Sequence, residues 1–138
     1  MSDIPPAARN ALDEFQQAAG WEQRARLLMQ WGNRLEPMCV EECSDAAQVS
    51  GCESRVWLVG EQQDDHWHFR ATSEARLLRG LLSVLLVRVN GLDSNQLQQI
   101  DVAHWFGQLG LSRQLSPSRS NGMNAVLERM HRISQQGD

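Results

Sequence analysis

A run of leucines between residues 76 and 89 places the strongest constraint on the fold. The segment RLLRGLLSVLLVRV has helical spacing and a wide apolar face. That face is made by Leu77, Leu78, Leu81, Leu82, Leu85, Leu86 and Val89. Ser73 is a good N-cap residue, Glu74 suits a first helical turn, and Asn90-Gly91 is typical of a helix end. The sequence therefore predicts a central core helix that is capped by Ser73 and ends at Asn90.

The segment before this helix predicts a β-hairpin. RVWLVGE (55–61) is rich in β-branched and aromatic residues, HWHFRAT (66–72) alternates apolar and polar residues, and QQDD between them is turn material. In the second strand, alternation places Trp67, Phe69 and Ala71 on one face and His66, His68 and Arg70 on the other.

The rest of the chain is predicted to be mainly helical. Amphipathic helices are expected over 6–19 and 21–34, the second with Trp21, Ala25, Leu28, Trp31 and Leu35 along its apolar stripe. Residues 36–48 have no clean period and predict a loop with one helical turn. A short helix capped by Asp93 or Ser94, a further short helical or irregular piece over 102–111 and a last helix over 118–134 follow. This order is typical of an α+β fold, and residues 1–138 are expected to form one domain.

Composition excludes several functions. All 13 basic residues are arginines, so the chain has no lysine for a pyridoxal-phosphate Schiff base or for a P-loop. A net charge of -4 disfavours nucleic-acid binding. The N-terminal residues lack signal-peptide features, and the longest apolar run is too short to span a bilayer. We therefore expect a soluble cytoplasmic protein with no nucleic-acid or membrane partner.

The stretch SGCESRVWLV (50–59) contains the main candidate for chemistry. Cys52 follows Gly51, which permits an unusual backbone angle, and it precedes a predicted strand, so it should lie on a turn. Arg55 lies three residues further on and could stabilise a thiolate. A functional thiol on a loop and a buried structural cysteine are both compatible with this pattern.

Two other uses of the cysteines are less favoured. Cys39, Cys43 and Cys52 could together ligate a metal, but zinc sites usually show closer paired spacing. The four histidines could supply a base for a cysteine hydrolase, but none lies in a recognisable signature. A disulfide between Cys52 and either of the other two cysteines is a further hypothesis for oxidising conditions.

The segment LSPSRSNGMNAV (115–126) opens the last predicted helix. Ser118, Arg119 and Ser120 lie where a helix N-terminus has unpaired N–H groups and partial positive charge. The segment could bind an anion or a partner. The simpler interpretation is ordinary capping, with an arginine that ties two loops together.

Taken together, these motifs resemble the SufE/CsdE family of sulfur-acceptor proteins. The resemblance rests on SGCESRVWLV, TSEARLLRGLLSVLL (72–86) and LGLSRQLSPSRSNGMNAV (109–126), and on WEQRARLLMQWGNRLEP (21–37), which is similar to that family's second helix. It covers about Trp21 to Met130. The fold it implies is a small antiparallel sheet covered by helices, similar to the NifU/IscU scaffold fold.

The resemblance also implies a function. Family members accept persulfide sulfur from a pyridoxal-phosphate cysteine desulfurase on the cysteine that matches Cys52, and they stimulate that enzyme. They pass the sulfur on for iron–sulfur cluster assembly or for another route such as tRNA modification. The cofactor belongs to the partner, so this chain needs none. Arg119 and Arg55 are then candidates for steadying the thiolate or the loop, and Gly51, Ser73, Glu74, Ser118 and Ser120 are candidates for partner binding.

Two alternatives to the sulfur-acceptor hypothesis stay open from the sequence. The chain could be a metal or cluster carrier that uses Cys39, Cys43 and Cys52. It could also be a regulator that binds the desulfurase without taking sulfur.

Overall fold

A computed structural model describes residues 4–52 and 54–136. Its sheet is a hairpin of β1 (Val56–Gln63) and β2 (His66–Ser73), paired antiparallel with Leu58 opposite Ala71. Trp67, Phe69 and Ala71 are buried along β2, whereas His66 is exposed and His68 and Arg70 are half-buried. The predicted hairpin and the predicted faces of its second strand are confirmed.

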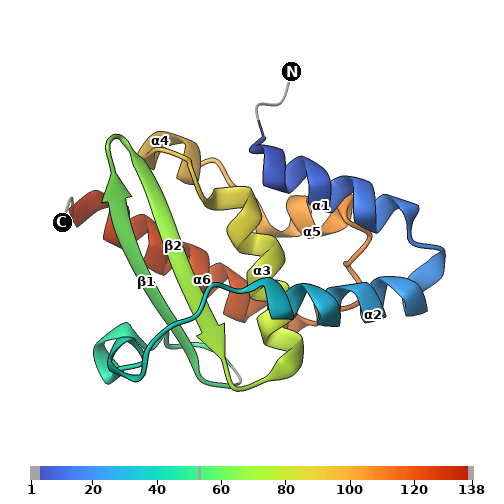
Figure 1. Cartoon of the computed structure of the whole chain (residues 1–138), viewed down its shortest axis with the longest axis horizontal. Coiled ribbons are helices and arrows are strands. Elements are labelled where there is room, and N and C mark those ends of the chain that lie inside the picture. Colours follow the sequence, from blue (N-terminus) through green and yellow to red (C-terminus); the bar gives the residue numbers. More distant parts are fainter. Residues whose placement is uncertain (1–3, 53, 137–138) are drawn as a thin grey trace.

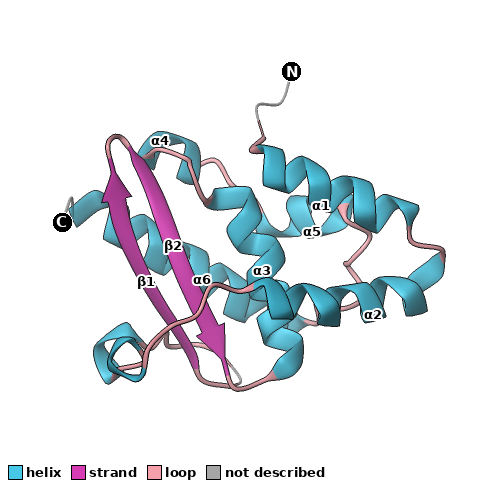
Figure 2. Ribbon diagram, viewed as in Figure 1, coloured by secondary structure: helices cyan, strands magenta, loops and turns pink. Residues whose placement is uncertain are grey.

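Helices cover the hairpin from one side (Figures 1 and 2). The helices are α1 (Pro6–Gln17), α2 (Gly20–Trp31), α3 (Arg76–Val89), α4 (Ser94–Leu97), α5 (Val102–Gln108) and α6 (Pro117–Gln136). α3 runs through the middle, contacts β2, and separates the hairpin from α1 and α2. α6 lies behind the hairpin and contacts β1. This arrangement confirms the predicted α+β fold with a small antiparallel sheet covered by helices.

The core is organised around α3, as the leucine pattern predicts. Its apolar side chains are almost all buried: Leu78, Leu81, Leu82, Val84, Leu85, Leu86 and Val89. α2 crosses α3 at very short range, since a Cβ on Gly80 would lie only 2.4 Å from the carbonyl oxygen of Leu28. Glycine at position 80 therefore lets the two backbones touch. The helix ends at Asn90-Gly91, as predicted, and Gly91 has a φ of 91°.

The start of α3 differs from the prediction. Ser73 is the last residue of β2, and the helix begins at Arg76 with Ala75 in the cap position. The Ser73 hydroxyl donates to the carbonyl of Arg55 at 2.6 Å and accepts from the N–H of Ala75 at 3.1 Å. Ser73 therefore bridges strand and turn instead of capping the helix, and Glu74 lies before the first helical turn. The prediction that Ser73 is the N-cap is wrong.

The stretch between α2 and β1 crosses the polar face of β2. Its residues 36–48 contain two 3-10 turns, Val40–Glu42 and Asp45–Ala47, where the sequence predicts one helical turn. Glu36 contacts His68 at 2.5 Å, and the carboxylate of Glu42 binds the guanidinium of Arg70. These bonds from Arg70 lower the pKa of Glu42 to about 2. The contacts hold the stretch against the hairpin.

The first helices also depart from prediction in detail. α2 ends at Trp31, and a 3-10 turn over Gly32–Arg34 replaces its predicted last turn. Trp21 is 53% exposed rather than part of the apolar stripe, and the guanidinium of Arg113 lies 4.8 Å from its ring centroid. Among the described helices, none has the length and apolar character that crossing a membrane requires.

Candidate functional site

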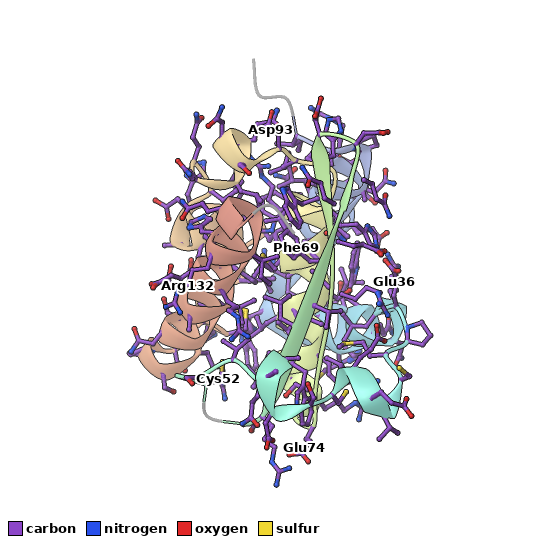
Figure 3. The ribbon with its side chains drawn as sticks, turned by 90° about the vertical axis from the view of Figure 1, so that its left-hand side faces the viewer. Glu36, Cys52, Phe69, Glu74, Asp93 and Arg132 are labelled. Carbon is purple, nitrogen blue, oxygen red and sulfur yellow. The ribbon has the colours of Figure 1, made fainter. Side chains whose placement is uncertain are left out.

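Cys52 lies on a loop whose two ends are joined by a backbone hydrogen bond at the start of β1. The N–H of Val49 donates to the carbonyl of Val56 at 2.8 Å, and Gln48 forms an isolated bridge with Trp57. The chain therefore reverses between positions 49 and 56. Gly51 has a φ of 95°, a backbone angle that residues with a side chain rarely adopt. The predicted unusual backbone angle before the cysteine is therefore confirmed. Figure 3 shows Cys52 at one end of the molecule, beside α6, with Asp93 at the opposite end.

The thiol of Cys52 is sheltered by α6. Its Sγ lies 3.7 Å from the carbonyl oxygen of Gly122, to which the S–H can donate. The side chain is half-buried and packs against the hydrophobic core. Burial raises the pKa of the Cys52 thiol, because the thiolate loses hydration. In this conformation burial therefore favours the protonated thiol over the thiolate.

A shifted pH dependence of thiol alkylation is expected from this burial. In a Cys39→Ser/Cys43→Ser background, iodoacetamide should alkylate Cys52 with a midpoint at higher pH in the folded protein than in the same variant unfolded in urea. The sign follows because burial disfavours the reactive thiolate. Rates measured by mass spectrometry across the pH range would check this. A folded midpoint equal to or below the unfolded one would contradict it.

Arg55, Ser73 and Glu74 meet at the same end of the molecule. Arg55 Nε lies 3.8 Å from Glu74 Oε1, and both side chains are mostly exposed. The Ser73 hydroxyl holds the Arg55 carbonyl, so the start of β1 and the turn before α3 are joined. Figure 3 places Glu74 and Cys52 at this end. The structure thus brings together three of the residues singled out in the sequence, of which Arg55 and Glu74 are mostly exposed and Ser73 is buried.

The SRSNG motif forms the first turns of α6. Arg119 Nη1 donates to the carbonyl of Gln114 at 3.3 Å, so this arginine ties the preceding loop to the helix. Ser118 is exposed, and Ser120 is half-buried. Sequence reasoning missed Gly122 as a site residue, although it is part of this motif. Its carbonyl is the polar contact of the Cys52 sulfur, which joins the two motifs in space.

The other cysteines and the histidines lie apart from this arrangement. All three cysteines are free thiols, with Cys39 exposed and Cys43 half-buried in the stretch that crosses β2. Within residues 4–52 and 54–136, no three histidine, cysteine or acidic side chains are grouped so that they could hold a metal ion. His68 contacts Glu36, and His131 contacts the carbonyl of Leu97.

Comparison with known proteins assigns the family. The model of the SufE family, described as an Fe-S metabolism associated domain, matches residues 9–134. The chain belongs to the SufE family. The "Sulfur acceptor protein CsdE" of Escherichia coli is 38% identical over 122 residues, covering 88% of this chain and 83% of that protein. An "Uncharacterized SufE-like protein" of Haemophilus influenzae is 32% identical over 123 residues, covering 88% and 98%.

A solved structure supports the fold of this SufE-family chain. The solution structure of a hypothetical protein from Thermus thermophilus matches with a TM-score of 0.76 and covers 96% of each chain. Sequence identity is only 16%, so this likeness bears on the fold alone. The resemblance inferred from the motifs is confirmed at the level of the family.

Proposed function

We propose that this protein accepts persulfide sulfur from a cysteine desulfurase on Cys52. The observation that carries the proposal is the placement of Cys52 on a loop closed by the Val49–Val56 bond, with its sulfur turned against Gly122. A sulfur carrier needs a thiol that a partner can reach and that is otherwise protected from oxidants and reductants. The name of the Escherichia coli relative, a sulfur acceptor, supports the same function.

The transfer is a thiol exchange. The Cys52 thiolate attacks the outer sulfur of the desulfurase persulfide, a bond forms between these sulfurs, and the desulfurase thiolate leaves. The outer sulfur keeps its proton or charge, and no oxidant or reductant is consumed. The loop is proposed to move away from Gly122 before the attack, since the sulfur is in contact with α6 there and burial raises the pKa of the thiol. Exposure to water, or to positive charge, then favours the thiolate.

The remaining site residues are assigned to the thiolate and to the partner. Arg55 and Arg119 are proposed to steady the thiolate or its loop, since Arg55 follows Cys52 closely and Arg119 belongs to the motif that packs on it. Gly51 gives the loop its shape through its positive φ. Four further residues are proposed to form the surface that binds the desulfurase. Glu74, Ser118 and Ser120 would contact it, and the buried Ser73 would hold the turn that carries Glu74.

The wider setting follows from the same proposal. The whole chain acts as one SufE-like domain in the cytoplasm, and pyridoxal phosphate belongs to the desulfurase. A downstream acceptor, such as an iron–sulfur scaffold complex or a tRNA thio-modification route, takes the sulfur from Cys52.

Stimulation of a cysteine desulfurase tests this function. With L-cysteine and a reductant, the wild-type chain is expected to raise sulfide release, because Cys52 clears the persulfide from the enzyme. Cys52→Ser should lose this stimulation completely. The Cys39→Ser/Cys43→Ser variant is the matched control and should stimulate like the wild type. Full stimulation by Cys52→Ser would contradict sulfur acceptance and favour non-covalent regulation.

A metal or cluster carrier is the other alternative. It requires Cys39, Cys43 and Cys52 to converge, and among the described residues no such grouping is present. Iron and zinc content after purification separates the two functions. Stoichiometric metal that is lost in the Cys39→Ser/Cys43→Ser variant would favour the carrier.

A further inference from the structure

One face of α6 holds the Cys52 loop along its length. Gly122, Ala125 and Arg129 are spaced three and four residues apart, so they share a side of the helix. The Gly122 carbonyl contacts the sulfur of Cys52, and a Cβ on Gly51 would lie 3.4 Å from the Cβ of Ala125. The loop therefore runs antiparallel to the helix, with the cysteine near the N-terminal end of α6.

Arg129 makes the polar part of this contact. One terminal nitrogen donates to the carbonyl of Gln48 at 3.3 Å, and the other donates to the carbonyl of Ala46. Both carbonyls lie in the chain just before the Val49–Val56 bond that closes the loop. A single guanidinium thus binds two backbone carbonyls at the start of the loop. Its planar fork of donors suits such a double contact.

The packing between the loop and the helix is incomplete at this point, although Val49 is buried in the hydrophobic core. A cavity of about 140 Å³ lies between them, lined by Val49, Ser50, Ala125, Glu128, Arg129 and Arg132. Arg132 instead pairs with Glu128 one turn earlier, at 2.9 Å. The two bonds of Arg129 add to the burial of Val49 and to its backbone bond with Val56 in attaching the start of the loop.

We propose that Arg129 is a positioning residue that holds the Cys52 loop in its sheltered conformation through a clasp, formed by the two bonds from its guanidinium to the carbonyls of Ala46 and Gln48. It acts on the cysteine through the backbone of residues 46 and 48 rather than by touching the sulfur. Release of the clasp would let the loop move from α6 and expose the thiol. The clasp therefore sets the fraction of molecules in which Cys52 is reachable. The inference deepens the proposed function, because a sheltered acceptor thiol is useful only if its exposure is controlled.

Alkylation of Cys52 by iodoacetamide tests the clasp without any desulfurase. In the Cys39→Ser/Cys43→Ser background, Arg129→Met should raise the alkylation rate at neutral pH roughly fivefold, as expected for losing a charged donor to partly solvated carbonyls. Arg132→Met is the matched control. It removes the same charge one turn away and should leave the rate unchanged. Arg129→Lys keeps the positive charge but has a single donating nitrogen in place of the two-nitrogen fork, and it should give an intermediate rate.

The direction of the effect separates the clasp from simple electrostatics. Loss of a nearby positive charge by itself would raise the pKa of the thiol and slow alkylation. Hydrogen exchange of the peptide spanning residues 46–56 should quicken in Arg129→Met and stay unchanged in Arg132→Met. If Arg129→Met unfolds, the Arg129→Lys rate decides. An unchanged or slower rate in the Arg129 variants, or an equal rise in Arg132→Met, would overturn the proposal. Because no sulfur is transferred, the result stands even if Cys52 is not the acceptor.

Discussion

Replacing Trp67 by alanine is expected to lower the free energy of unfolding by about 4 kcal/mol, the loss typical of truncating a buried tryptophan. Trp67 is 1% exposed and lies on the core face of β2. Its ring stacks on Phe69 with centroids 6.0 Å apart. The substitution leaves a large cavity between the hairpin and the helices. Urea unfolding followed by circular dichroism measures the change.

Trp21 provides the control for this prediction. It undergoes the same substitution, but it is 53% exposed and its ring faces Arg113. Trp21→Ala should cost less than about 1 kcal/mol, as surface replacements and exposed cation–π contacts do. Equal losses for the two variants would mean that the core does not lie beneath β2.

Gly80→Ala is expected to destabilise the protein by about 2 kcal/mol through the crossing of α2 and α3. A Cβ at position 80 would lie 2.4 Å from the carbonyl oxygen of Leu28, so the helices must separate. The steric cost of about 3 kcal/mol exceeds the gain of up to about 1 kcal/mol from replacing glycine within a helix. The same urea unfolding measurement gives the difference.

Gly107→Ala is the matched control for the crossing. Gly107 also lies within a helix, α5, but a Cβ there would meet nothing closer than the Ser112 hydroxyl at 3.7 Å. This variant should be neutral or more stable by up to about 1 kcal/mol. A stable Gly80→Ala protein would show that α2 and α3 are not in backbone contact.

Local patterns predicted the elements of the fold well. Alternation in HWHFRAT identified the buried face of β2, and the leucine spacing identified α3 and its end at Asn90. Asp93 caps α4, as expected, because its side chain accepts from the N–H of Gln96. Each of these signals is contained within a few residues of sequence.

Features that depend on contacts between residues far apart in the sequence were not predicted. The position of Ser73 in the sequence suggested a helix cap, but its hydroxyl donates to the carbonyl of Arg55 across the hairpin. The contact of Cys52 with Gly122 spans 70 positions, and the bond from Arg129 to Gln48 spans 81. A glycine and an arginine on a helix carry no local sign of such partners. The Cys52 loop could be located from the sequence, whereas the helix face that holds it could not.

The intact mass of the protein after incubation with a cysteine desulfurase and L-cysteine, without reductant, tests the central claim most directly. We predict that the wild type and the Cys39→Ser/Cys43→Ser variant each gain one sulfur atom, and that Cys52→Ser gains none. Sulfur on Cys52→Ser, or none on the wild type beside an active desulfurase, would contradict the assignment of Cys52 as the acceptor.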